Sequence, residues 1–252
     1  MRRCTLSGLA IAVSLAFAIF APALARAGEV QVAVAANFTE PAKEIATAFA
    51  AATGHKALLS FGASGQLYAQ IAHGAPYQVF LSADAERAQK AEADGLAVVG
   101  SRFTYAVGRL ALYSKSLDLT DGAKVLKTGR FEHVAVADSA AAPYGLAAVE
   151  TLRKLGLYDP LKPKLVTGAN ITQTYQFVAT GAAELGFVAY SQVIHEKPGS
   201  VWLPPKDDYA PIAQQAVLLK TGAADPAAKA FLVFLKSPAA QAIIQRYGYQ
   251  VR

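Results

Sequence analysis

The sequence predicts an α/β protein built as two lobes. Strand-like and helix-like segments alternate over residues 30–94 and again over residues 134–188. Two longer strand-like runs, at 103–113 and 212–219, bracket the second series. The economical topology is therefore two α/β lobes joined by two long crossing strands, with the C-terminal segment returning to the first lobe. A single doubly wound sheet is the alternative, which this length also permits.

The first series predicts three strands, each followed by a helix. Thr39 and Pro41 mark the start of the first helix, and Gly54 marks its end. Ser64 occupies the expected N-cap position of the second helix, where two flanking glycines permit a tight turn. The expected strands lie at 30–35, 57–59 and 79–81, and the expected helices at 39–54, 64–73 and 85–94.

The second series predicts the other lobe, and two helices close the chain. Strands are expected at 134–137 and 185–188, and helices at 145–155, 172–180, 226–235 and 238–247. With the crossing runs as boundaries, we expect residues 28–108 and 208–252 to form lobe 1. Residues 109–207 are then expected to form lobe 2.

The first 27 residues have the pattern of an export signal. Arg2 and Arg3 precede an apolar run, and Ala25-Arg26-Ala27 matches an A-x-A cleavage site. We therefore expect cleavage near Ala27 and a periplasmic protein. The single cysteine, Cys4, would be removed with the signal, which leaves no disulfide and no thiol chemistry.

The charge of the chain is mild once the signal is set aside. The formal charge is +6, but three arginines and no acidic residue lie in residues 1–27, so the mature chain carries +3. The remaining charges are scattered, with no basic stripe for nucleic acid and no cationic amphipathic helix for a membrane surface. We expect neither as a partner.

Four predicted junctions before helices share one kind of chemistry. They are rich in small residues and neutral hydrogen-bond donors, and they contain no Lys, Arg, Asp, Glu or His. Ligands of open α/β sheets bind at the carboxyl ends of strands, where such loops lie. The four junctions are Ala36-Asn37-Phe38, Ala63-Ser64-Gly65, Ala142-Pro143-Tyr144-Gly145 and Ala169-Asn170-Ile171-Thr172.

If the lobes face each other, these junctions line a cleft suited to a small, fully ionised oxyanion. Backbone N–H groups, hydroxyls and an Asn amide can all donate, and helix N-termini supply a favourable field. An acidic residue would help only a ligand that carries a proton, so its absence disfavours phosphate. Taken singly, Ser64 could also serve only as a helix cap, and Asn37, Tyr144 and Asn170 as turn or half-buried residues.

The sequence offers little for catalysis. Ser64 lacks the second glycine at the spacing of a nucleophile elbow, and the four histidines stand isolated from one another. We therefore expect no enzyme activity, no cofactor and no protein–metal coordination. An exported α/β hydrolase that acts through Ser64 stays open as an alternative from a different class.

Several motifs resemble the periplasmic molybdate-binding proteins of ABC transporters, in register over nearly all of the mature chain. The resemblance implies a two-lobed type II binding protein, in which a mixed sheet flanked by helices forms each lobe and the ligand cleft lies between them. It also implies a molybdate or tungstate ligand and delivery to a membrane permease. The motifs are Ala36-Asn37-Phe38, Gly62-Ala63-Ser64-Gly65, the run from Gly74 to Asp84, the run from Ala142 to Ala147, and the run from Gly181 to Val188.

The resemblance also implies a set of ligand-binding residues. The first-loop donors of the family fall on Ala36 and Asn37, its serine on Ser64, the tyrosine of one branch on Tyr144, and a backbone N–H donor on Ile171. That branch can carry Thr at the position of Ala36, so here only the Ala36 backbone or Asn37 can donate. The tyrosine of another branch falls near Ala189-Tyr190, but Tyr190 is one position off and is expected to pack as core.

We thus expect a monomeric transport receptor for molybdate and tungstate, which have the same charge and nearly the same size. The tetrahedral ion would be held by the protein through hydrogen bonds to its oxygens. A sulfate or thiosulfate receptor is the alternative within the same class.

Overall fold

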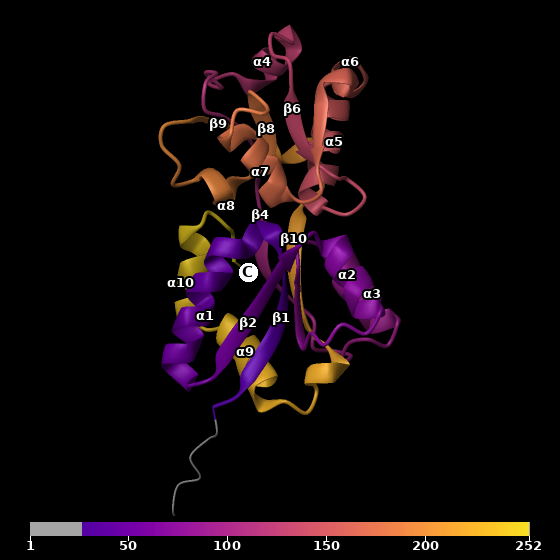
Figure 1. Ribbon diagram of the computed structural model, residues 1–252, viewed down its shortest axis with the longest axis vertical. Coiled ribbons are helices and arrows are strands. Elements are labelled where there is room, and N and C mark those ends of the chain that lie inside the picture. Colours follow the sequence, from indigo (N-terminus) through magenta and orange to yellow (C-terminus); the bar gives the residue numbers. More distant parts are fainter. Residues whose placement is uncertain (1–26, 252) are drawn as a thin grey trace, which may run out of the picture.

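The computed structural model describes residues 27–251, arranged around two five-stranded sheets. The two sheets and their helices follow one another along the long axis of the molecule, and both ends of the described chain lie in the same body (Figure 1). We call that body lobe 1 and the other body lobe 2. The predicted export signal, residues 1–27, lies outside the described residues except for Ala27.

Lobe 1 contains a mixed sheet with the order β2-β1-β3-β10-β4. The first three strands of this order run parallel, and β10 is antiparallel to both of its neighbours. The strands are β1 (Glu29–Ala35), β2 (Lys56–Gly62), β3 (Val79–Ser82), β4 (Phe103–Gly108) and β10 (Ile212–Leu218).

Helices cover both faces of this sheet because side chains alternate along its buried strands. In β1, Val32 and Val34 join the core under α1, α9 and α10, whereas Ala33 faces the core under α2 and α3. Gly54 ends α1 in the left-handed conformation at φ 75°, as the sequence predicts. The helices are α1 (Thr39–Thr53), α2 (Ser64–Ala72), α3 (Glu86–Ala93), α9 (Pro226–Leu235) and α10 (Pro238–Arg246).

Lobe 2 repeats the plan with the strand order β7-β6-β8-β5-β9. Its strands are β5 (Leu110–Ser114), β6 (Val134–Ala137), β7 (Leu165–Gly168), β8 (Leu185–Ala189) and β9 (Ser200–Trp202). Its helices are α4 (Gly122–Thr128), α5 (Pro143–Lys154), α6 (Tyr158–Leu161), α7 (Ile171–Ala179) and α8 (Tyr190–Val193). Of these, β7, β9, α4, α6 and α8 were not predicted, because such short elements carry too few residues to show a period.

The run at 103–113 passes from one sheet to the other as predicted, but the expectation of two long continuous strands is wrong. The run at 103–113 is two strands in two sheets: β4 pairs with β10, β5 pairs with β8 and β9, and Arg109 lies between them. The return strand β10 pairs only within lobe 1, so residues between β9 and β10 make the second passage. The backbone N–H and C=O groups of β4 are paired in the sheet of lobe 1, and those of β5 are paired in the sheet of lobe 2, so the run divides between the two sheets.

Within residues 27–251, no single helix is long and apolar enough to cross a membrane. The pair α9 and α10 would have the length and composition together, but the two helices meet at 59°. Both helices bury residues in the core of lobe 1, including Phe231 and Ile244.

Candidate ligand-binding site

The structure brings the candidate residues from both lobes to one small cavity. The volume of this cavity is about 10 Å³. The cavity meets the carboxyl ends of β1, β2 and β3 from lobe 1, and the first turns of α5 and α7 from lobe 2. The lining residues are Ala35, Ala36, Asn37, Gly62, Ala63, Ser64, Ala83, Ala142, Pro143, Tyr144 and Ile171, and none has a charged side chain.

Ser64 does not cap its helix, contrary to the prediction. The N-cap of α2 is Ala63, and Ser64 is the first helical residue. The Ser64 hydroxyl is buried and accepts a hydrogen bond of 2.9 Å from the backbone N–H of Ala83. Within residues 27–251 the Ser64 hydroxyl makes no other hydrogen bond, so its proton stays available to an acceptor in the cavity.

Tyr144 repeats this arrangement from lobe 2. It is the second residue of α5 and is 1 % exposed, and its phenol oxygen accepts a hydrogen bond of 3.2 Å from Gln214 Nε2. Burial raises the pKa of Tyr144 well above its usual range, and the nearby Tyr249 phenol adds to this effect. The phenol therefore stays protonated and can donate.

The side-chain amide of Asn37 is committed to the protein. Asn37 Nδ2 donates to Gln214 Oε1 at 2.9 Å and to the Tyr249 phenol at 3.0 Å. Both amide protons are therefore used within the protein, and the prediction that the Asn37 amide donates to a ligand is not supported. What remains in this loop are the backbone N–H groups of Ala36 and Asn37, which open a short 3₁₀ helix at Ala36–Phe38.

Ile171 lines the cavity and can contribute its backbone N–H group as a donor. It is the first residue of α7, where an N–H group has no partner within the helix. Asn170 is the N-cap, and its side chain accepts a hydrogen bond of 3.0 Å from the backbone N–H of Gln173. Asn170 therefore serves as a helix cap, and Ile171 buries its side chain in the core of lobe 2.

Buried polar residues that the sequence analysis missed support these donors. Gln214 lies in β10, fully buried, and contacts both Asn37 and Tyr144. The Tyr249 phenol donates to the backbone carbonyl of Asn37 at 2.8 Å, and the Ser191 hydroxyl donates to the same carbonyl at 3.0 Å. The adjacent glutamines Gln214 and Gln215, amid the apolar residues of β10, are the signal that the sequence offered.

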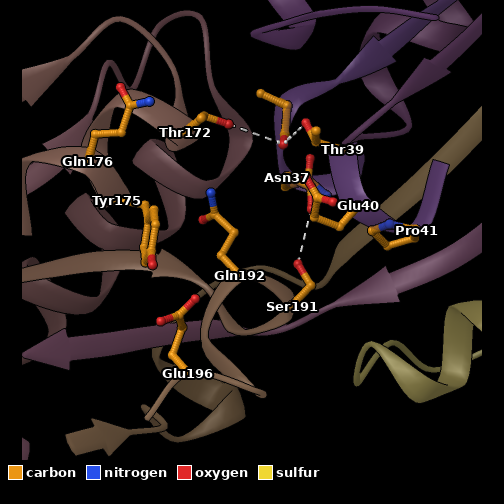
Figure 2. Close-up of a pocket in the computed structure, with 11 residues that line it drawn as sticks. Asn37, Thr39, Glu40, Pro41, Thr172, Tyr175, Gln176, Ser191, Gln192 and Glu196 are labelled. Atoms are coloured by element: carbon orange, nitrogen blue, oxygen red, sulfur yellow. Dashed lines mark hydrogen bonds between the residues drawn. The ribbon is translucent and has the colours of Figure 1, made fainter. Parts of the chain in front are cut away.

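Direct contacts between the lobes close the cavity. The backbone N–H of Gly65 donates to the carbonyl of Ala141 at 2.9 Å, and the Arg87 guanidinium donates to the carbonyl of Ala140 at 2.7 Å. Figure 2 shows contacts on another side, where Ser191 reaches the Asn37 carbonyl and the Thr172 hydroxyl reaches a backbone carbonyl of the same loop. The described structure is therefore in a closed arrangement.

A larger groove between the lobes shares only Ala36 and Asn37 with the cavity. Figure 2 shows Glu40 and Glu196 among its lining side chains, together with Tyr175, whose pKa is raised to about 12 by burial and by Glu196. Two carboxylates make this groove less favourable for an anion than the cavity beside it.

The site lacks the partners that catalysis would require. A nucleophilic serine needs a base within hydrogen-bond reach, whereas the partner of Ser64 is a backbone N–H group. Residues 27–251 hold no group of three or more His, Cys, Asp or Glu placed to bind a metal ion. Tyr190 does not line the cavity and packs half-buried against the core of lobe 2.

The fold and the site define an extracytoplasmic receptor of the two-lobed kind. A family model described as bacterial extracellular solute-binding protein matches residues 30–250, and the chain belongs to this family. It is similar to the molybdate-binding protein ModA of Rhodobacter capsulatus, with 58 % identity over 97 % of this chain and 96 % of the relative. It is also similar to that of Azotobacter vinelandii, with 53 % identity over 89 % and 91 % of the two chains.

A solved structure agrees with these sequence relatives. The periplasmic molybdate-binding protein of Azotobacter vinelandii superposes with a TM-score of 0.86 at 43 % identity, covering 88 % of this chain and 99 % of that chain. The family and this neighbour confirm the predicted two-lobed binding-protein fold. They also confirm that the chain belongs with transport receptors and not with enzymes, which removes the hydrolase alternative.

Proposed function

We propose that this chain binds molybdate or tungstate in the cavity between its lobes and delivers the ion to an ABC transporter permease. The observation that carries the proposal is the paired support of Ser64 and Tyr144. Each oxygen accepts a hydrogen bond from a protein N–H group, which turns its proton toward the cavity. The names of the related proteins point to the same ligand.

The donor set matches a tetrahedral dianion that carries no proton. Two hydroxyls and the backbone N–H groups of Ala36, Asn37 and Ile171 surround the cavity from several directions. Each hydrogen bond to a charged group contributes about 1.5–3 kcal/mol. The first turns of α2, α5 and α7 line the cavity, so their dipoles stabilise the negative charge without a Lys or Arg.

Ligand size is the basis for discrimination against sulfate. All these donors can be satisfied together only by an ion that fills the closed cavity. A smaller tetrahedron would leave buried donors unpaired, at about 1–3 kcal/mol each. Phosphate retains a proton near neutral pH, and the cavity lining holds no carboxylate to accept it.

Isothermal titration with molybdate, tungstate, sulfate and phosphate tests the proposal. We expect tight binding of the first two ions and far weaker binding of the other two. Equal affinities for sulfate and molybdate would overturn the proposal in favour of a sulfate or thiosulfate receptor.

The proposal includes the organisation of the mature protein. It places lobe 1 at residues 28–108 and 208–252 and lobe 2 at residues 109–207, with Asn37 and Ser64 contributed by lobe 1 and Tyr144 and Ile171 by lobe 2. It also includes cleavage of the export signal near Ala27 and a monomeric receptor in the periplasm. Mass spectrometry of the exported protein and light scattering test these two points.

A further inference from the structure

We infer that Gln214 is a positioning residue that holds the Tyr144 proton toward the bound oxyanion and couples this donor to the Asn37 loop. The inference rests on the proposed function and adds to it a residue outside the cavity lining. Gln214 Oε1 accepts from Asn37 Nδ2 at 2.9 Å and from the Tyr105 phenol at 3.0 Å. Gln214 Nε2 donates to the Tyr144 phenol at 3.2 Å.

The direction of these hydrogen bonds follows from the Tyr249 phenol, which has a single proton to donate. That proton goes to the Asn37 carbonyl at 2.8 Å or to the Ser191 hydroxyl at 2.9 Å, so the phenol accepts from Asn37 Nδ2 at 3.0 Å. The Asn37 amide is thereby oriented with Nδ2 also facing Gln214. Gln214 must present its oxygen to Asn37, because an inverted amide would place two N–H donors face to face. Its Nε2 then points at Tyr144.

The consequence reaches the ligand through Tyr144. A phenol oxygen that accepts from Gln214 Nε2 has its own proton left for another acceptor, and Tyr144 lines the cavity. If Gln214 presented an acceptor instead, the phenol would donate to it, and a lone pair would face the anion. Gln214 therefore controls whether Tyr144 attracts or repels the ligand.

The backbone around Gln214 is shaped to allow this contact. Gln214 pairs with Ala106 and Gln215 pairs with Thr104, so the extra residue Tyr105 forms a bulge in β4. The Tyr105 phenol donates to Gln214. Gly108 ends the same strand, and a Cβ there would lie 2.1 Å from the Tyr144 phenol oxygen and 2.8 Å from Gln214 Nε2. Only glycine leaves room for the hydrogen bond between them.

A double-mutant cycle with Gln214→Glu and Tyr144→Phe tests the inference by titration with molybdate. The glutamate has the same shape but offers acceptors to Asn37, Tyr105 and Tyr144 alike. Tyr144→Phe alone should weaken binding about 10- to 100-fold, and Gln214→Glu by at least about 100-fold. In the Gln214→Glu background, Tyr144→Phe should cost less than about 3-fold, because that phenol no longer serves the ligand.

Two controls separate positioning from general damage. Gln215→Glu introduces the same charge at the next residue, which contacts Arg102 and Thr104 away from the cavity, and should leave the affinity near that of the wild type. Ser64→Ala should cost the same factor in the wild-type and Gln214→Glu backgrounds, because Ser64 is supported by Ala83 and not by Gln214.

The outcomes distinguish this inference from the proposed function. If the wild type binds molybdate but Tyr144→Phe costs the same factor in both backgrounds, the inference is overturned and the proposed function stands. If the wild type binds no molybdate, both are overturned. Should Gln214→Glu fail to fold, Gln214→Met removes the Nε2 donor without adding a charge, and Tyr144→Phe must then cost less in the Gln214→Met background than in the wild type.

Discussion

The hydroxyl of Ser64 shows how a single side chain can gain a role from its neighbours. Its sequence position at the start of a helix suggests a cap, but Ala63 takes the cap position and Ala83 donates to the hydroxyl. Because the oxygen accepts from Ala83, the hydroxyl proton stays available to an acceptor in the cavity. The hydrogen bonds of single side chains therefore determine which donors are available in the cavity.

We predict that Ser64→Ala weakens molybdate binding about 10- to 100-fold, because one charge-assisted donor is lost. The substitution also leaves the buried N–H of Ala83 without its acceptor, so the unfolding free energy should fall by about 1–3 kcal/mol. Calorimetry and thermal denaturation measure the two effects. Ser60→Ala, in the strand leading to the same loop, should change neither, and an unchanged dissociation constant for Ser64→Ala would exclude Ser64 as a donor.

The buried phenols predict how stability depends on pH. Burial raises the pKa of Tyr105, Tyr144 and Tyr249 in the folded protein. Because the folded values lie above the unfolded value of about 10, their contribution is fully present below pH 10 and is lost as the pH rises further. We expect a flat thermal stability from pH 7 to about 9 and a decline above about pH 10. Molybdate affinity should stay constant over the flat range, whereas a loss starting near pH 8 would contradict the raised pKa of Tyr144.

At the scale of elements, the starts of the helices carry the site. The helices α2, α5 and α7 all begin at residues that line the cavity. Their amino ends offer N–H groups whose positions are set by helix geometry, so several donors are placed without using any side chain. Asn170 stabilises one such start as a cap.

A matched pair of substitutions at the start of α7 tests this use of backbone. Proline is tolerated at the first helical position, and Asn170 before it already has the extended conformation that proline requires, with φ −154° and ψ 173°. Ile171→Ala and Ile171→Pro both remove the buried side chain, so both should lose about 2–5 kcal/mol of stability. Only Ile171→Pro should lose molybdate affinity in calorimetry. Equal affinities for the two variants would contradict a backbone donor at this position.

At the scale of the whole molecule, the contacts between the lobes predict that ligand binding and closure occur together. The proposed ligand donors line the cavity from both lobes, and contacts such as Arg87 with Ala140 form only when the lobes meet. A ligand that touches one lobe cannot favour the closed state to the same extent. A permease can then distinguish a loaded receptor from an empty one by its shape.

We predict that the ligand-free protein opens about the two passages between β4 and β5 and between β9 and β10. Small-angle scattering should give a smaller radius of gyration at saturating molybdate than without it. Sulfate at the same concentration is the control and should cause much less compaction. Identical scattering curves with and without molybdate would refute the hinge.

Local sequence patterns predicted most of the fold. Some patterns act within a few residues, so they could be interpreted without tertiary context. These are the helix-start residues Thr39 and Pro226, the glycine that ends α1, and the apolar alternation of β1. The same is true of the neutral junctions at Asn37, Ser64 and Ile171, whose place at the ends of strands follows from the alternation of strands and helices.

The tertiary structure decided the features that depend on partners distant in sequence. The long run at 103–113 divides at Arg109 because its two halves pair with different sheets. The Asn37 amide turns away from the cavity because Gln214 and Tyr249, 177 and 212 residues further along the chain, occupy its protons. The sequence determined which donors are available, and long-range hydrogen bonds determined which of them a ligand can use.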